Sequence, residues 1–194
     1  VKRIIYAYDQ IRDLVINAEI SLRLLSPSTE ECIKYISNIN FADSEEDQHN
    51  NPRANLLSSV VQIFSKEHNW QILLTSDLEG GIFNKILKRH PQDLKKKLVL
   101  GQASHHGARL NLNKLFWGRL NKSQNLPMII SVGQNSYGHP AKETITYFKQ
   151  NNFDIYTTNE LWNYDNPNSI KIVKPPTANI LDSFSQPAFT ISNN

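Results

Sequence analysis

From residue 59 onward the sequence alternates short apolar runs with segments of helical spacing, and this alternation constrains the fold more than any other feature. The first two runs, SVVQIF and QILLTS, are joined by the polar KEHNW, which predicts a hairpin of two strands. Alternating helical and strand-like segments follow: IFNKILKRH (opened by a Gly pair), LVLGQAS, NLNKLFWGRL, MIISVG, AKETITYFKQNN, then the strands DIYTT and SIKIVK. Such alternation is typical of α/β proteins. We therefore expect an α/β sheet with helices packed on it.

The first 54 residues predict two β-like runs, IIYAY and ISLRLLSP, followed by one helix. Pro27 ends the second run because it cannot donate to a β-ladder. Ser28 and Glu31 fit a capping box, so STEECIKYISNIN predicts a helix. Its apolar positions recur near helical spacing: Cys32, Ile33, Ile36 and Ile39. The acidic FADSEEDQHNNPRA predicts an exposed loop.

The composition excludes several classes of protein. A length of 194 residues with 39% hydrophobic and 20% charged residues predicts one globular domain over 1–194, with an irregular tail over 175–194. A net charge of +3 is too small to indicate nucleic-acid binding by itself. Cys32 is the only cysteine, which excludes a disulfide framework and a zinc site made of cysteines alone. No apolar run reaches the ~20 residues of a membrane span and no signal peptide is visible, so we expect a cytoplasmic protein.

Polar side chains follow three of the predicted strands. Asp77 follows QILLTS, His105 and His106 follow LVLGQAS, and His139 follows MIISVGQNSYG. Ligands in open α/β sheets collect at the carboxyl ends of strands, and imidazole and carboxylate are ligands of Zn²⁺ and Mn²⁺. Each residue also has a structural interpretation: Asp77 could cap the next helix, the histidine pair could be a surface or core feature, and His139 could be a turn residue.

Taken together, the motifs NLLSSVV, QILLTSDLEGG, LVLGQASHHGA, IISVGQNSYGHPAKETITYF and IYTTNE occur in an order that resembles a known family. That family is the metallo-β-lactamase superfamily, in the branch typified by the soluble domain of the competence protein ComEC. The match covers about residues 20–160 and corresponds to the second half of the fold. The resemblance implies part of an αββα sandwich, with a mixed β-sheet and helices on the outside.

The resemblance also implies roles for individual residues. Asp77 would bridge two divalent metal ions, Zn²⁺ or Mn²⁺, and His106, or alternatively His105, would be a ligand of the second ion. The other imidazole would orient that ligand or face the substrate, and His139 would contact the scissile group or the leaving oxygen. The remaining candidates would bind substrate: Asn55 and Ser58 at the wall of the pocket, and Tyr137 beside His139. The two ions would share a hydroxide that attacks a phosphodiester, such as that of a nucleic acid.

The chain departs from the family pattern at three positions and in one whole motif. Ser76 stands where the family has Gly, Ala108 where it has Ser, and Asn159 where it has Asp. The H-x-H-x-D-H motif, which supplies most of the metal ligands, does not occur in the sequence. The chain begins at Val1 rather than Met, which we interpret as an upstream half that is missing. The alternative is a degenerate member that binds no metal.

These readings lead to three hypotheses. The first is a metal-dependent phosphodiester hydrolase, whose partners would be a nucleic-acid substrate, the missing half or a partner chain, and a second copy if it forms a homo-oligomer. The second is a non-catalytic module that acts in binding or assembly, and the third is a lactonase or esterase. An isolated half would leave apolar surface exposed. Of the aromatic residues, we expect Trp70, Trp117 and Trp162 in the core and Tyr137 outside it.

Overall fold

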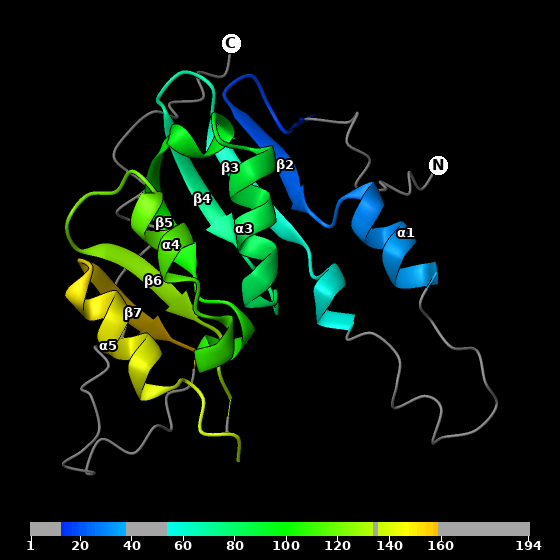
Figure 1. Ribbon diagram of the computed structural model, residues 1–194. Coiled ribbons are helices and arrows are strands. Elements are labelled where there is room, and N and C mark those ends of the chain that lie inside the picture. The colour runs from blue at the N-terminus through cyan, green and yellow to red at the C-terminus, as the bar shows by residue number, and fades with distance from the viewer. Residues whose placement is uncertain (1–12, 38–53, 134–135, 159–194) are drawn as a thin grey trace.

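The computed structural model describes residues 13–37, 54–133 and 136–158, and within them seven strands form one mixed sheet (Figure 1). The strands lie side by side in the order of the chain: β1 (Leu14–Val15), β2 (Ile20–Ser26), β3 (Val60–Ser65), β4 (Trp70–Leu74), β5 (Lys97–Gln102), β6 (Leu126–Ile130) and β7 (Phe153–Thr157). The pairs from β1 to β4 are antiparallel, and the pairs from β4 to β7 are parallel. The predicted α/β class and the hairpin of β3 and β4 are therefore confirmed.

Three helices connect the parallel strands and cover one face of the sheet (Figure 1). They are α3 (Gly80–Arg89) after β4, α4 (Lys114–Arg119) after β5 and α5 (Lys142–Gln150) after β6. From β4 to β7, each crossover moves one strand further in the same direction across the sheet. Such crossovers are right-handed as a rule, so helices of crossovers that move in one direction lie on one face of the sheet. All three helices were predicted from the sequence. The parallel strands therefore direct their carboxyl ends to one edge of the sheet.

The core lies between this face and the helices, and Trp117 is at its centre. Trp117 is 1% exposed and its ring makes edge contacts with three phenylalanines: Phe116, Phe148 and Phe153. It packs directly over Gly101 of β5, where an added Cβ would lie 3.0 Å from Trp117 Cζ3 and 2.9 Å from Met128 Cε. The glycine in the LVLGQAS run therefore makes room for the largest side chain of the core.

The opposite face of the sheet is also apolar, but its side chains are only half-buried. Leu22, Ile63 and Ile72 face one another across β2, β3 and β4. Further half-buried side chains of this face are Leu24, Val61, Leu74, Ile129 and Tyr156. We call these eight side chains the open sheet face.

The predicted capping box is confirmed at the start of α1 (Thr29–Ser37). The backbone N–H of Ser28 donates to the Glu31 carboxylate (2.8 Å), and the N–H of Glu31 donates to Ser28 Oγ (3.2 Å). The apolar side of the helix does not enter the core, since Ile33 and Ile36 are about 60% exposed (61% and 59%). Instead the buried residue is Glu31, whose carboxylate pairs with Arg89 of α3 at 2.9 Å. The helix therefore contacts α3 through this ion pair and not through its apolar side. Figure 1 shows α1 at the β2 side of the sheet.

Some predictions fall outside the described residues, namely the strands IIYAY and SIKIVK, most of the acidic loop, the tail over 175–194, Asn159 and Trp162. Of the other tryptophans, Trp117 is buried as expected, whereas Trp70 is half-buried. His90 bonds to Asp93 through Nδ1 at 3.1 Å. No helix in the described ranges is both long and apolar enough to cross a membrane.

Candidate functional site

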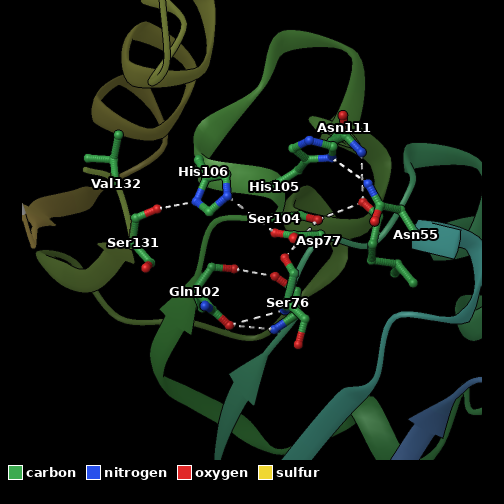
Figure 2. A network of polar contacts seen from close by, with 12 residues as sticks. Asn55, Ser76, Asp77, Gln102, Ser104, His105, His106, Asn111, Ser131 and Val132 are labelled. Carbon is green, nitrogen blue, oxygen red and sulfur yellow. Dashed lines mark hydrogen bonds and ion pairs between the residues drawn. The ribbon is translucent and has the colours of Figure 1, made fainter. Parts of the chain in front are cut away.

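The candidate site is built from three loops that follow the parallel strands β4, β5 and β6. These loops carry Asp77, the pair His105 and His106, and His139. The turn after β4 is attached to β5 through Gln102, whose Oε1 accepts hydrogen bonds from the backbone N–H groups of Thr75 (2.9 Å) and Ser76 (3.2 Å). Figure 2 shows this contact below Asp77. The position of Asp77 therefore depends on a side chain of the neighbouring strand.

Ser76 lies in the left-handed region of backbone conformation, with φ of 47°. Glycine is favoured there because it has no Cβ. The backbone of Ser76 therefore has a conformation for which Gly is suited. The serine hydroxyl gains a partner, since Ser76 Oγ donates to the carbonyl of Ser59 at 3.0 Å.

The loop after β5 has three consecutive residues in the left-handed region. The φ angles are 49° at His105, 55° at His106 and 77° at Gly107. Non-glycine residues in this region cost on the order of 1–3 kcal/mol and persist where the surroundings hold them. His105 N–H donates to the carbonyl of Ser76 at 2.9 Å, and the carbonyl of Gly107 accepts from the N–H of Ala141 at 3.1 Å. The strained loop is therefore bonded to both neighbouring loops.

A polar contact below this loop fixes its start. Ser104 Oγ donates to the carbonyl of Leu78 at 2.6 Å, and the buried side chain of Asn111 donates to the same carbonyl at 2.9 Å. Gly107 allows the close packing of the other end, because an added Cβ there would lie 2.8 Å from Pro140 Cβ. The two histidines thus stand on a backbone with little freedom to move.

His106 points toward Asp77 (Figure 2), with Nε2 of the ring 3.8 Å from Asp77 Oδ1. Nδ1 of the same ring lies 2.5 Å from the carbonyl oxygen of Ser131. A carbonyl only accepts, so Nδ1 carries the proton and, in the neutral ring, Nε2 presents a lone pair. The carboxylate of Asp77 also presents lone pairs, and 3.8 Å exceeds the length of an N–H···O hydrogen bond. Two acceptors therefore face each other across a gap.

The 3.8 Å gap lies between the separations that two ligands of one divalent cation have in different geometries. Two ligands at ~2.0–2.1 Å from one ion are roughly 3.3 Å apart in tetrahedral geometry and about 4 Å apart if they lie opposite each other. A ligand histidine that donates its other nitrogen to a carbonyl is also the usual arrangement at metal sites. The two side chains are about half exposed (47% and 45%), so an ion has access to them. Within the described ranges no group of three or more His, Cys, Asp or Glu side chains is placed to hold a metal.

His105 points away from Asp77 toward Asn55 (Figure 2), which donates from Nδ2 to His105 Nδ1 at 3.3 Å. The neutral ring of His105 therefore carries its proton on Nε2, which makes that atom a donor. The ring of His139 lies 6.1 Å from that of His105 between centroids, and Tyr137 stacks on His139 at 6.2 Å with an interplanar angle of 22°. The neighbouring histidines thus differ: one faces the carboxylate, and the other faces Asn55 and His139.

Burial lowers the pKa of His139 from its ordinary value, and repulsion from His105 and His106 lowers it further. The lowered pKa favours the neutral imidazole, which can accept a proton from a reacting group or donate its own ring N–H.

A pocket of 720 Å³ opens beside the histidines. Its lining includes His105, His139, Asn55 and Tyr137, together with Gly80 and Gly81 at the start of α3. Arg109 and Glu143 also line it and face each other at 3.9 Å. Of the residues predicted to bind substrate, Asn55 and Tyr137 therefore line this pocket. Ser58 does not; it is half-buried, and its N–H donates to the carbonyl of Asn55 at 3.2 Å.

Five residues that position the site or line its pocket were not predicted from the sequence: Gln102, Ser104, Arg109, Leu110 and Asn111. Gln102 and Ser104 are polar residues at the end of an otherwise apolar strand, which is a signal that could have found them. The carbonyl of Ser131 is a backbone group and leaves no trace in the sequence. Asp77 does not cap α3, because the N-cap position is Glu79.

The fold and this site define an α/β protein with a histidine–carboxylate site at the carboxyl ends of its parallel strands. No family model, no curated protein and no solved structure matches the chain.

Proposed function

We propose that this chain contributes the site of a metal-dependent hydrolase that cleaves phosphodiester bonds, such as those of a nucleic acid. The observation that carries the proposal is the pair of acceptors Asp77 Oδ1 and His106 Nε2, which face each other at 3.8 Å. A metal ion, a proton or a bridging water would make the contact of such groups favourable, and the distance suits a shared metal ion better than a direct hydrogen bond. The resemblance to the metallo-β-lactamase superfamily supports the same conclusion.

Asp77 and His106 would hold the cation, and the remaining ligands would come from residues outside the described ranges, from an upstream half of the fold or from a partner chain. In the two-ion arrangement of the family, Asp77 would bridge both ions. A divalent cation bound there would activate water near neutral pH and stabilise charge on the phosphoryl oxygens. Ser131 supports this role because its carbonyl fixes the proton of His106 on Nδ1 and leaves Nε2 as a ligand.

The chain's own residues next to this pair suit the handling of a phosphodiester. His105, with its proton on Nε2, can donate a hydrogen bond to a phosphoryl oxygen, and Asn55 holds its ring in place. His139 has a lowered pKa and stays neutral at pH values where an ordinary histidine begins to be charged. From that state its ring N–H can donate a hydrogen bond to the oxygen of the leaving group.

The test combines metal content with turnover, and it uses the full-length protein that contains this chain. Bound Mn²⁺ and Zn²⁺ are measured after equilibrium dialysis, and hydrolysis of bis(p-nitrophenyl) phosphate is followed by release of p-nitrophenolate. We expect Asp77→Asn and His106→Gln to lower both metal content and turnover by at least tenfold. The matched controls Asp154→Asn and His68→Gln change exposed residues outside the site and should leave both quantities unchanged. Equal metal content in Asp77→Asn and the unchanged chain would contradict the proposal.

A second candidate function is a non-catalytic module of the same fold that acts in binding or assembly. It is favoured by the finding that the described residues bring together only two of the ligands that a Zn²⁺ site requires. The same experiment separates the two candidates. A chain that takes up neither ion and hydrolyses no diester would support the binding module.

A further inference from the structure

Two apolar side chains stand at the opening of the 720 Å³ pocket. Leu110 and Tyr137 both line the pocket, and both are 81% exposed. We call these two residues the apolar rim. Single exposed apolar residues need no explanation, but two at the opening of a polar pocket indicate contact with a ligand.

The backbone at Leu110 is fixed, so the exposure of its side chain is not that of a loose loop. It lies in η4 (Arg109–Asn111), next to the buried Asn111. The carbonyl oxygen of Leu110 lies so close to α3 that a Cβ at Gly80 would be 2.8 Å away. The backbone therefore packs on the start of α3 while the side chain extends into solvent.

Tyr137 presents a flat surface next to the candidate reacting groups. Its ring stacks on His139, and its high exposure leaves the rest of the ring in solvent. Aromatic rings that are stacked on one side and open on the other are suited to bind a further planar group.

The charges of the pocket lining favour an uncharged group, rather than a further phosphate, inside the pocket beside the scissile bond. Glu79 and Glu143 both line the pocket, and one cation, Arg109, lies beside Glu143. Carboxylates repel a second phosphate but accept hydrogen bonds from hydroxyl and ring N–H groups. A nucleoside has a planar ring and such donors but no charge of its own.

We propose that Leu110 and Tyr137 bind the base of the nucleoside next to the scissile phosphate, and that they give the site its preference for nucleotide diesters over alkyl diesters. The inference rests on the proposed function, because it names the group that the hydrolase would hold beside the bond it cleaves. Leu110 contacts the edge or face of the base as an apolar surface, and Tyr137 stacks on it.

The test compares two diesters that differ only in this group, thymidine 5′-(p-nitrophenyl phosphate) and methyl p-nitrophenyl phosphate, with Mn²⁺ present. In each, water adds to phosphorus, the P–O bond to p-nitrophenolate breaks, and one proton is released to solvent. We expect the unchanged chain to have at least tenfold higher kcat/KM on the thymidine diester. Tyr137→Ala and Leu110→Ala should each reduce that preference about tenfold, mainly through a higher KM for the thymidine diester.

Two controls separate binding by the rim from a general loss of structure. Tyr137→Phe keeps the flat ring and should retain most of the preference. Leu115→Ala removes a leucine of α4 that is also exposed (50%) but does not line the pocket, and it should behave like the unchanged chain. Equal kcat/KM on both diesters, or an equal effect of Leu110→Ala and Leu115→Ala, would overturn the inference.

Binding measurements keep the inference testable if neither diester is hydrolysed, in which case the proposed function itself fails. Thymidine 5′-monophosphate and methyl phosphate are then titrated by calorimetry, with and without Mn²⁺. Tighter binding of the nucleotide that is lost in Tyr137→Ala and Leu110→Ala would support the rim as a base-binding surface. Equal affinities for the two ligands would overturn it.

Discussion

Thr75 and Gln102 are joined by two hydrogen bonds that connect the end of β4 to the end of β5. The backbone N–H of Thr75 donates to Gln102 Oε1 at 2.9 Å, and Thr75 Oγ1 donates to the carbonyl of Gln102 at 2.7 Å. Gln102 also accepts from the N–H of Ser76, the residue that precedes Asp77. The carboxylate of the candidate site is therefore positioned by the strand that carries the histidines.

We predict that Gln102→Ala weakens both the fold and the proposed metal site. Two backbone N–H groups lose their acceptor, which should lower the free energy of unfolding by about 1–3 kcal/mol. The freed turn should lower Mn²⁺ affinity by about 10-fold, the lower end of the range for residues that orient metal ligands. Denaturant unfolding and calorimetric titration measure the two effects. Gln102→Glu, which keeps an acceptor at Oε1, should recover part of the affinity, and exposed Gln92→Ala should change neither quantity.

We predict that the two faces of β4 differ in their contribution to stability. Leu73 is 0% exposed under the helices, whereas its neighbour Ile72 belongs to the half-buried open sheet face. Leu73→Ala should lower the free energy of unfolding by about 2–5 kcal/mol, and Ile72→Ala by clearly less, because less surface is buried there. Denaturant midpoints of the two variants provide the comparison. Equal losses would mean that the open sheet face is covered in solution.

We predict that stability declines in acid through Glu31 and Asp93. Burial alone would raise the pKa of Glu31, but hydrogen bonds from Ser28 and Arg89 and the charges of Arg89 and Lys85 outweigh it and hold the pKa below its ordinary value. Burial is likewise outweighed at Asp93, where His90 and Arg23 lower the pKa. A carboxyl with a lowered folded-state pKa stabilises the fold above its unfolded-state pKa, ~4, and this contribution is lost as pH falls through the folded-state pKa.

The measurement for this prediction is the free energy of unfolding at pH 7 and at pH 3. Glu31→Gln should reduce the difference between the two, because the substituted residue no longer titrates. Glu30→Gln removes an exposed carboxylate one position earlier and serves as the matched control. An unchanged pH dependence in Glu31→Gln would refute the assigned role.

We predict that His105 lowers the pKa of His139. Burial is the larger cause and remains in a His105→Gln variant, whereas part of the charge repulsion is removed. The pKa of His139 should therefore rise in this variant but stay below its ordinary value of 6.5. Titration of the ring proton signals by NMR measures it, with the exposed His68→Gln as control. No rise in His105→Gln would show that the two rings do not interact.

The sequence predicted much of the fold because the relevant signals are local. The capping box of Ser28 and Glu31 involves residues three positions apart, and the strands from β3 to β7 coincide with apolar runs. The exposure of Ile33 and Ile36 was not predicted, because helical spacing says which residues share a face but not what that face contacts. Burial of Glu31 depends on Arg89, a residue from another helix.

The candidate site was predicted as a set of residues but not as an arrangement. Positions after parallel strands indicated that Asp77 and the histidines share one edge of the sheet. The two adjacent histidines point in different directions, His106 toward Asp77 and His105 toward Asn55. These directions depend on backbone angles that no sequence pattern specifies. The two residues of the apolar rim, Leu110 and Tyr137, come to the pocket from separate loops. No sequence pattern indicated that Leu110 would lie there.

The identity of strand order and chain order has a consequence for synthesis on the ribosome. Each strand pairs with the one made immediately before it, so the sheet can grow at a single edge as the chain emerges. Asp77 emerges first, the two adjacent histidines follow, and His139 arrives last, after β6 has been added. A nascent chain would therefore acquire the pair Asp77 and His106 before it acquires the imidazole that stacks on Tyr137.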